Sequence, residues 1–184
     1  RGKAAASATE IARAAGVNKA MLFYYFGSKE ELYRAAFRKW FEDLTKNLEE
    51  KIENVEPGLP MIEAFVRAHT GYLTKRPGLV KLIIRELLAC DAGPPPVIAE
   101  FAESFQLFKR VLIHSIEIAK ASGQIRDVEP IQTAVNIISM DVFIFLGGPI
   151  VSLIAPEVDM RKFVEDRVNH ILDLLMNGLR VKTE

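Results

Sequence analysis

The sequence predicts an all-α protein in two parts, a small N-terminal helix-turn-helix and a larger helical body. Apolar residues recur three or four positions apart through most of the 184 residues, which is the period of an α-helix. Helix start signals such as Ser or Pro precede these runs, and stop signals such as Gly follow them. No stretch alternates apolar and polar residues as a half-buried strand does.

The first two helices lie within residues 8–32, which read ATEIARAAGVNKAMLFYYFGSKEEL. Ser7 and Glu10 have the spacing of a capping box, so a helix should begin at residue 8. Gly16 should end it, because glycine adopts the left-handed conformation of a helix C-terminus without steric cost. Asn18 is a favourable N-cap for a second helix over 19–25. Two short helices joined by a tight glycine turn form a helix-turn-helix.

The second helix should have two different sides. Leu22 and Phe26 are four positions apart and are expected to face the core. The opposite side carries Ala20, Met21 and Tyr24, flanked by Lys19 and Tyr25. A phenol or a lysine can bond a DNA phosphate, and a methionine can contact a thymine methyl group, so this side suits DNA. The alternative is a small helical hairpin with a solvated face.

This segment resembles the DNA-binding segment of TetR-family transcriptional regulators. The resemblance rests on Ile11-Ala12, on Ala15-Gly16-Val17 followed by Asn18 to Phe26, and on Ser28-Lys29-Glu30-Glu31-Leu32. It implies DNA contacts by Thr9, Asn18, Lys19, Ala20, Met21, Tyr24, Tyr25 and Lys29. Three residues depart from the family pattern: Ala20 replaces a frequent Gly, Met21 replaces a small polar residue, and Phe23 replaces Tyr. More of the phosphate contact would therefore fall on Tyr24.

The charge distribution supports the same interpretation. The chain has 24 basic and 24 acidic residues, but residues 1–41 hold eight basic and three acidic side chains, a net of +5, which leaves −5 for the rest. A basic end on an acidic body is expected of a DNA reader with a separate body. The single cysteine, Cys90, excludes an internal disulfide framework and fits a reducing cytosol. No signal peptide is visible, and we expect a cytoplasmic location.

The TetR-like pattern normally has a whole helix before the helix-turn-helix. Only residues 1–6 precede it in this sequence, and Arg1-Gly2 reads as the tail of that helix. We therefore expect that the first helix, one wall of the DNA-binding domain, is missing from the sequence as written.

A long helix is expected over 29–54. Ser28 and Glu31 repeat the capping-box spacing, and Pro57-Gly58 should end the helix. An apolar stripe runs along it through Tyr33, Phe37, Trp40, Leu44, Leu48 and Ile52. The resemblance makes this helix the connector between a DNA-binding domain, 1–46, and an effector-binding and dimerisation domain, 47–184. Lys29 opposes the helix dipole at its position, which favours an anion partner over a solvated lysine.

The body should consist of further helices. Apolar periodicity predicts them over about 61–75, 79–87, 97–122, 130–146 and 160–175. Gly147-Gly148-Pro149 is expected to break the fourth, and the apolar run at 142–155 is then too short to span a membrane. We therefore expect no membrane partner.

The last helix predicts a homodimer. Its apolar side chains cover more than half of its circumference, and Val164, Val168, Ile171 and Leu175 are the predicted interface residues. TetR-like proteins dimerise through their last two long helices, so that two reading helices meet two half-sites of a palindrome. The alternative is that these helices form the centre of a monomer core.

The resemblance also implies an effector cavity inside the body. The candidate lining residues are Phe65, His69, Tyr72, Phe101, Phe105, Phe108, Met140 and Asp141. Aromatic residues at helical spacing are equally typical of a packed core, and His69 fits a hydrogen-bonded core histidine. Asp141 lies inside an apolar helix, where an unpaired carboxylate is costly. It would meet a cationic effector, pair with Arg or Lys from another helix, or face solvent.

No motif of an enzyme is present. The three histidines are far apart in sequence, there is no second cysteine for a metal site, and no glycine-rich phosphate loop or nucleophile motif occurs. We expect no catalytic residues, cofactor or metal.

Taken together, these features predict a DNA-binding transcriptional regulator, a repressor released from a palindromic operator on double-stranded DNA by an unknown small-molecule effector. The alternative is a helical, dimeric interaction protein that keeps a vestigial DNA reader.

Overall fold

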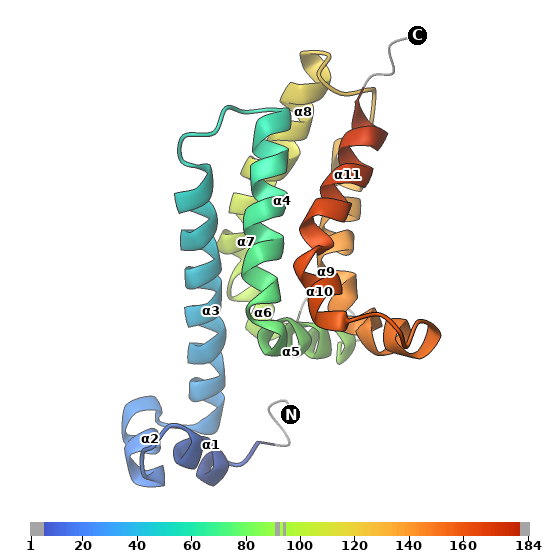
Figure 1. Ribbon diagram of the computed structural model, residues 1–184. Helices are drawn as coiled ribbons and strands as arrows, with labels where there is room; N and C mark the ends of the chain where they lie inside the picture. Colours follow the sequence, from blue (N-terminus) through green and yellow to red (C-terminus); the bar gives the residue numbers. More distant parts are fainter. Residues whose placement is uncertain (1–5, 91–92, 94, 181–184) are drawn as a thin grey trace.

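The computed structural model describes residues 6–90, 93 and 95–180, and within them the regular structure is helical without a strand. The elements are α1 (Ala8–Ala14), α2 (Lys19–Phe26), α3 (Lys29–Ile52), α4 (Leu59–Thr74), α5 (Pro77–Leu88), α6 (Pro96–Ala99), α7 (Ala102–Phe108), the π-helical η1 (Lys109–Ile113), α8 (His114–Ala121), α9 (Pro130–Ile154), α10 (Met160–Glu165) and α11 (Arg167–Leu179). This confirms the predicted all-α class. Figure 1 shows α1 and α2 as a small unit at one end of the long α3, with the other helices grouped along the rest of it.

The caps of the first two helices form as the sequence predicts. The hydroxyl of Ser7 accepts a 3.1 Å hydrogen bond from the backbone N–H of Glu10, and the Glu10 carboxylate accepts one of 3.0 Å from the N–H of Ser7. Gly16 takes a φ of +68° in the turn. The side-chain oxygen of Asn18 accepts from the N–H of Met21 at 2.7 Å, so α2 starts at Lys19. The helix-turn-helix is therefore confirmed.

The core of this N-terminal unit is smaller than predicted. Ala12 and Leu22 are buried at 3% and 4% exposure, but Phe26, which was expected to face the core, is 38% exposed. Among the described elements, α1 and α3 are the main ones in contact with α2. The short α1 and the start of α3 cover Leu22, whereas Phe26 lies at the end of α2 beside the Gly27 turn.

Helix α3 joins the N-terminal unit to the body without interruption. It has 24 residues, which corresponds to about 36 Å at 1.5 Å per residue. Five residues of the predicted apolar stripe are buried along it, namely Phe37, Trp40, Leu44, Leu48 and Ile52, whereas Tyr33 is half-buried. Phe41, which was not predicted, is buried as well. The helix passes position 46, where the domain boundary was predicted, with no change of backbone, so both parts share one continuous helix.

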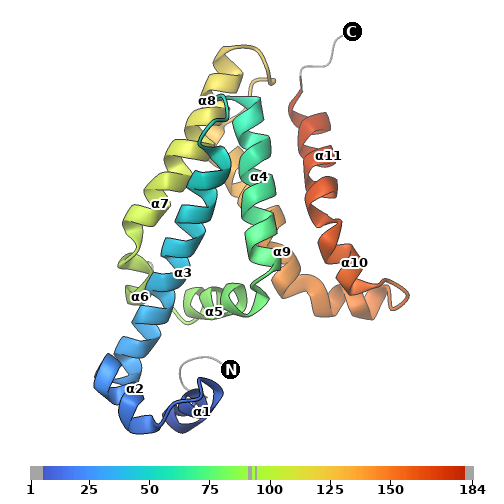
Figure 2. The ribbon, with the colours of Figure 1, turned by 60° about the vertical axis from the view of Figure 1, so that its left-hand side comes forward.

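Helix α4 forms the centre of the body. It packs against α3, α5, α8, α9, α11 and η1, and its residues Ile62, Phe65 and Val66 are 0% exposed. Figures 1 and 2 agree that α3, α4, α9 and α11 run roughly side by side, while α5 crosses beneath them on the side of the N-terminal unit. The crossing α5 therefore lies between the body and the start of α3.

The segment predicted as one helix over 97–122 is divided. Helices α6 and α7 are separated at Glu100-Phe101, and η1 inserts a π-helical turn at Lys109–Ile113 before α8. Leu107 and Leu112 both remain buried, at 7% and 1% exposure, on either side of the start of this turn. π-Helical turns inside helices often occur at functional sites.

The predicted break at Gly147-Gly148-Pro149 is wrong, because α9 continues through it to Ile154. Proline removes one backbone hydrogen bond and crowds the preceding turn, so it bends a helix more often than it stops one in a packed setting. Figure 2 shows α9 bending toward its C-terminal end. Gly147 is buried, and a Cβ built there would lie 2.7 Å from the Phe143 ring.

By length and composition, α9 is the single helix among the described residues that is long and apolar enough to cross a membrane. The most apolar 18-residue window has a mean hydropathy of 2.1 and is 28% buried. One such helix is weak evidence, since core helices of globular proteins meet the same test. Most of this window of α9 is therefore exposed in the single chain.

The final segment forms two helices instead of the single one predicted. Asp159 caps α10 by accepting a 2.9 Å hydrogen bond from the N–H of Arg161. Asp166 is the last residue associated with α10, its N–H donating to the backbone oxygen of Lys162 at 2.9 Å, and α11 starts at Arg167. α11 packs against α4 and α9, and it buries Ile171, Leu172, Leu175 and Leu179.

Candidate nucleic-acid interface and effector cavity

The exposed side of α2 holds the residues predicted to meet DNA. Tyr24 and Tyr25 are 84% and 70% exposed, and Met21 is 42% exposed. The two phenol rings are nearly perpendicular, with centroids 5.4 Å apart. The Nζ of Lys19 lies 5.7 Å from the centroid of the Phe23 ring. The helix thus presents a cation, two phenols and a thioether to solvent.

The remaining predicted contacts lie next to this helix in the N-terminal unit. Thr9, Asn18 and Ala20 are exposed, and Lys29 is half-buried at the first position of α3. The Ser28 hydroxyl caps α3 by accepting from the N–H of Glu31 at 3.1 Å. The structure therefore brings all eight predicted residues into one unit, with seven of them exposed. Their contact with DNA stays a prediction.

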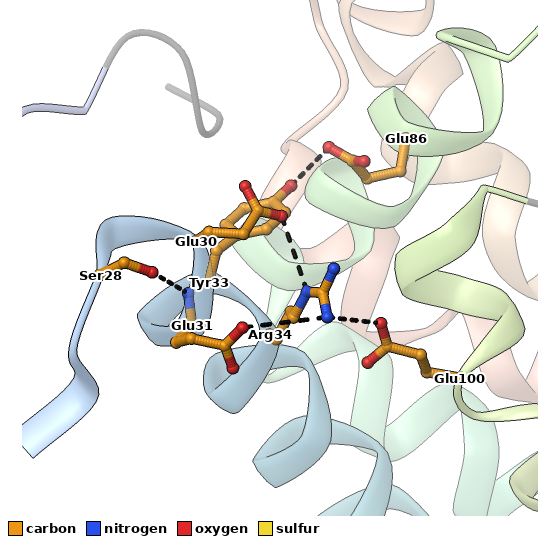
Figure 3. A network of polar contacts seen from close by, with 7 residues as sticks. All are labelled: Ser28, Glu30, Glu31, Tyr33, Arg34, Glu86 and Glu100. Carbon is orange, nitrogen blue, oxygen red and sulfur yellow. Dashed lines mark hydrogen bonds and ion pairs between the residues drawn. The ribbon is translucent and has the colours of Figure 1, made fainter.

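Polar contacts tie the first turns of α3 to the body (Figure 3). The Tyr33 hydroxyl donates a 2.6 Å hydrogen bond to the Glu86 carboxylate on α5. Arg34 pairs with Glu100, just after α6, at 3.2 Å, and also approaches Glu30 at 3.7 Å and Glu31 at 3.9 Å. Burial, followed by the hydrogen bond and negative charge of Glu86, raises the pKa of Tyr33 far above its usual value. The phenol therefore remains a hydrogen-bond donor at physiological pH.

An apolar cavity of about 520 Å³ lies next to these contacts, inside the body. Its walls come from α3, α4, α5, α6, α7 and α9. This volume is within the range of roughly 300–1,000 Å³ that is typical of small-molecule sites. Helix α3 contributes Trp40, Phe41 and Leu44, so the same helix carries the N-terminal unit and one wall of the cavity.

The structure places only part of the predicted lining set at the cavity. His69, Phe105 and Phe108 line it. The other predicted residues are absent from the described wall: Phe65, Tyr72, Phe101, Met140 and Asp141. Phe65 and Phe101 are core residues at 0% and 8% exposure, stacked on His69 and Phe41 respectively. The Tyr72 hydroxyl donates to the backbone oxygen of Trp40 at 3.4 Å, and its ring carries the Arg76 guanidinium at 4.0 Å.

Most of the wall was missed by sequence reasoning. The missed residues are Trp40, Phe41 and Leu44 on α3, Leu73 on α4, Val80, Ile83, Ile84 and Leu87 on α5, Ile98 on α6, and Ile138, Ser139, Val142, Phe143 and Leu146 on α9. Periodicity marks these positions as facing inward but does not say whether a partner helix or an empty space faces them. The predicted lining set favoured aromatic residues and a lone carboxylate, and it therefore omitted the aliphatic residues that form most of the wall.

The partner of Asp141 is a histidine. Its carboxylate is 0% exposed and lies 2.7 Å from His69 Nδ1, and it accepts a 2.6 Å hydrogen bond from the Thr70 hydroxyl. The expectations of an Arg or Lys partner, a solvent-facing position or a direct role in the cavity wall are therefore wrong. Both carboxylate oxygens are used within the core, which fits the rule that buried charges are paired.

The residues predicted to form the dimer interface lie mostly inside the chain. Ile171 and Leu175 are 0% and 7% exposed in the protein's own core, and Val164 and Val168 are half-buried. A side chain already buried by its own chain has no surface left for a partner. The prediction that Ile171 and Leu175 form the dimer interface is therefore wrong. In the last three helices, the large apolar residues that are exposed are instead Ile131, Val135, Phe143, Leu146, Ile150, Leu153 and Ile154 on α9 and Leu174 on α11.

Within the described residues, no group of three or more His, Cys, Asp or Glu side chains is arranged to hold a metal ion. Cys90 is a free, half-buried cysteine. The His69 ring both contacts Asp141 and lines the cavity.

Residues 1–36 match the family model of bacterial regulatory proteins, tetR family. None of the curated protein sequences compared with the chain matches it significantly. Solved structures resemble it over nearly its whole length. The TetR-family regulator PfmR from Thermus thermophilus has a TM-score of 0.70 at 20% identity, covering 97% of this chain and 92% of that one.

Two further solved structures have the same fold. The ketosteroid transcriptional regulator KstR2 of Mycobacterium tuberculosis has a TM-score of 0.74 at 14% identity, covering 98% of this chain and 87% of that chain. The regulator FadR from Bacillus subtilis, solved in complex with stearoyl-CoA, has a TM-score of 0.67 at 17% identity. The match covers 96% of this chain and 90% of that chain. These three structures are named as transcriptional regulators and not as enzymes.

These likenesses agree with the geometry described above: a capped helix-turn-helix with an exposed second helix, a continuous α3, and a helical body around an apolar cavity. Residues 1–36 therefore match the tetR family of bacterial regulatory proteins, and the whole chain has the fold of the transcriptional regulators compared with it.

Proposed function

We propose that the protein is a homodimeric transcriptional repressor that acts in the cytoplasm and leaves a palindromic operator when a small molecule enters the cavity. One observation carries this proposal. Helix α3 begins at the exposed DNA-facing unit and, about 16 Å further along, lines the cavity with Trp40. A change in the cavity wall is therefore transmitted along one continuous helix.

The N-terminal unit supplies the chemistry for DNA. Lys19, Tyr24, Tyr25 and Lys29 can contact phosphates, which positions the protein on the duplex without reading sequence. Met21 lies among them on the exposed side of α2, where a thioether can contact a thymine methyl group. α2 is therefore the proposed recognition helix, and Met21 is its proposed base contact.

A second copy of the chain is the proposed occupant of the exposed apolar face of α9. Ile131, Val135, Phe143, Leu146, Ile150 and Leu153 recur at helical spacing along most of the helix. An apolar stripe of this length matches the seam of a helix bundle, and a two-fold dimer uses the same surface on both partners. Leu174, 64% exposed on the adjacent α11, extends the face. The half-buried Val164 and Val168 remain candidates for its edge.

The contacts in Figure 3 are the proposed link between the cavity and the N-terminal unit that would bind DNA. Glu86 lies on α5, one residue from the cavity residue Leu87, and Glu100 lies two residues after the cavity residue Ile98. Through Tyr33 and Arg34 both segments hold the first turns of α3. A ligand that displaces α5 or α6 therefore changes the orientation of the N-terminal unit. In a dimer this alters the spacing of the two recognition helices and lowers operator affinity.

The ligands named for similar structures support a small-molecule effector. KstR2 is described as a ketosteroid transcriptional regulator, and FadR was solved in complex with stearoyl-CoA. A ketosteroid and the stearoyl chain of stearoyl-CoA are both largely apolar, as is the cavity described here, whereas the CoA part of stearoyl-CoA is multiply charged.

Selection of binding sites from a random pool of duplex DNA tests the proposal. The full chain, at near-physiological salt, is expected to enrich a palindrome. The matched control is Tyr24→Ala combined with Lys29→Ala, which should enrich little or nothing while folding normally. A folded, dimeric protein that enriches no sequence would overturn the regulator proposal. It would favour the alternative, a helical interaction protein with a vestigial reader.

A further inference from the structure

The effector cavity has very few polar groups on its wall. Among the described residues that line it, His69, Ser139 and Trp40 carry polar side-chain atoms, and His69 is the single ionisable one. The indole N–H of Trp40 has no hydrogen-bond partner among the described residues, but it is sealed inside the core and is not open to the cavity. The Ser139 hydroxyl is already engaged, because it donates a 2.7 Å hydrogen bond to the backbone oxygen of Val135. This leaves His69 as the side chain that can recognise a polar group of a ligand.

The orientation of the His69 ring is fixed on several sides. Nδ1 lies 2.7 Å from the buried Asp141 carboxylate, which is itself held by Thr70. One face of the ring stacks on Phe65 at a centroid distance of 5.3 Å, and the Phe108 ring stands perpendicular to it at 5.5 Å. Because a carboxylate only accepts hydrogen bonds, the hydrogen shared with it belongs to Nδ1.

The opposite nitrogen, Nε2, is left for a ligand. It has no hydrogen-bond partner among the described residues, and it is not among the atoms sealed inside the core without a partner. With Nδ1–H pointing to Asp141, Nε2 is an acceptor in the neutral ring and a donor in the charged ring. A hydroxyl or carboxyl group can pair with either form, whereas a hydrocarbon or a halide leaves Nε2 unpaired.

The rest of the wall determines the rest of the ligand. Leu44, Val80, Ile84 and Val142 offer only carbon, and Leu87 continues the apolar surface toward solvent at 50% exposure. Phe143, 61% exposed in the single chain, lies where the cavity meets the face of α9 proposed for a second copy. No lysine or arginine is among the described lining residues, so a multiply charged group has no counter-ion inside. Burying such a group unpaired would be costly.

We propose that the cavity binds a predominantly apolar molecule that carries one oxygen function, a hydroxyl or carboxyl group, and that His69 Nε2 pairs with that group. This rests on the proposed function, because it names the chemical class of the effector for the same cavity. His69 is the residue that determines specificity, and Asp141 and Thr70 are positioning residues that hold its ring.

The chain contains its own reporter for the test. Trp40 is the single tryptophan of the sequence and lines the cavity, so its fluorescence should change when the cavity fills. We would titrate the full chain with n-decanol and with n-decyl fluoride, which has the same chain length but no hydroxyl group. The wild-type protein should bind n-decanol roughly five- to tenfold more tightly, the value of one hydrogen bond.

Three variants test which side chain is responsible for the preference for n-decanol. His69→Phe should remove the preference for n-decanol, and Val142→Phe, which fills part of the cavity, should weaken both ligands at least tenfold. His114→Gln changes an exposed histidine and should leave both affinities unaltered. If His69→Phe fails to fold because Asp141 loses its partner, the comparison of the two ligands in the wild-type protein still tests whether the cavity prefers a hydroxyl group.

Equal wild-type affinity for the two ligands, or unchanged binding in Val142→Phe, overturns the proposal. Absence of binding of both ligands by a protein that selects an operator overturns the ligand class but leaves the DNA-binding function standing. Selective, His69-dependent binding of n-decanol that leaves operator affinity unchanged supports the ligand class and refutes effector release. The two proposals therefore fail in different ways.

Discussion

The hydroxyl of Tyr33 on α3 donates a 2.6 Å hydrogen bond to the carboxylate of Glu86 on α5, across 53 positions of sequence. Hydrogen bonds to charged acceptors are shorter and stronger than neutral ones. This bond joins the start of the helix that carries the DNA-facing unit to a helix that lines the cavity (Figure 3). The proposed DNA-binding unit and the cavity, which are separate in sequence, are thus connected by this side-chain pair, together with the Arg34–Glu100 ion pair.

Tyr33→Phe should reduce operator affinity of the ligand-free protein about fivefold. The aromatic ring and its contact with Phe37 at 5.0 Å remain, while a bond worth about 1 kcal/mol in holding the first turns of α3 is lost. Affinity for a selected operator is measured by fluorescence anisotropy. Asp43→Asn is the control, because it breaks the 2.7 Å Lys39–Asp43 bond within α3 without freeing α3 from the body. Equal operator affinity in the two variants would contradict a coupling role.

Met21→Ala should change which DNA sequence is selected, and Tyr24→Ala or Lys29→Ala should weaken all sequences to a similar extent. Base contacts discriminate by about 1–3 kcal/mol per position, whereas phosphate contacts are independent of sequence. The comparison is made by repeating the selection with each variant. Met61→Ala, on α4 in the body, serves as the control. An unaltered preferred sequence with Met21→Ala would remove the proposed reading role of this residue.

Operator affinity should fall steeply with salt, because cations that contact phosphates release condensed counterions. The logarithm of the binding constant is expected to decrease with the logarithm of salt concentration by about 0.9 per phosphate contact. Lys19→Ala should make this slope shallower by about one unit. Lys162→Ala, in the distant α10, should leave the slope as in the wild type. A binding constant that does not depend on salt would be incompatible with the proposed interface.

Leu153→Glu on α9 should convert the proposed dimer into a monomer. Leu153 is 80% exposed, so the substitution leaves the fold of one chain intact but places a charge in the proposed seam. Leu88→Glu makes the same change at a residue of 76% exposure on α5 and should remain dimeric. Light scattering coupled to size-exclusion chromatography distinguishes the two states. A dimeric Leu153→Glu protein would place the interface elsewhere.

Asp141→Asn should lower the free energy of unfolding by about 2 kcal/mol. The Asp141 carboxylate accepts hydrogen bonds from His69 Nδ1 and from the Thr70 hydroxyl, whereas the amide NH2 group of asparagine can only donate, so one buried donor would lose its acceptor. Asp173→Asn, on the exposed side of α11, should change stability by no more than about 0.5 kcal/mol. Denaturant unfolding at one fixed protein concentration measures both, since the proposed dimer would make stability depend on concentration. Equal stability of the two variants would show that the buried pair contributes little.

The sequence by itself determined the local structure of this protein. The caps at Ser7, Asn18 and Ser28 and the stripe from Phe37 to Ile52 fixed the helix-turn-helix and the connector, because each depends on residues within one or two helical turns. The same local spacing carried the resemblance that the family match confirmed.

Only the tertiary structure decided where inward-facing side chains meet one another and where they leave space. Asp141 contacts His69 and Thr70, which lie more than 70 positions away in the sequence. Ile171 is part of the chain's own core, and the exposed apolar stripe lies on α9. Gly147-Gly148-Pro149 reads as a helix stop locally, yet α9 continues through it. Periodicity states which side of a helix is apolar, but the neighbour on that side depends on how distant segments pack.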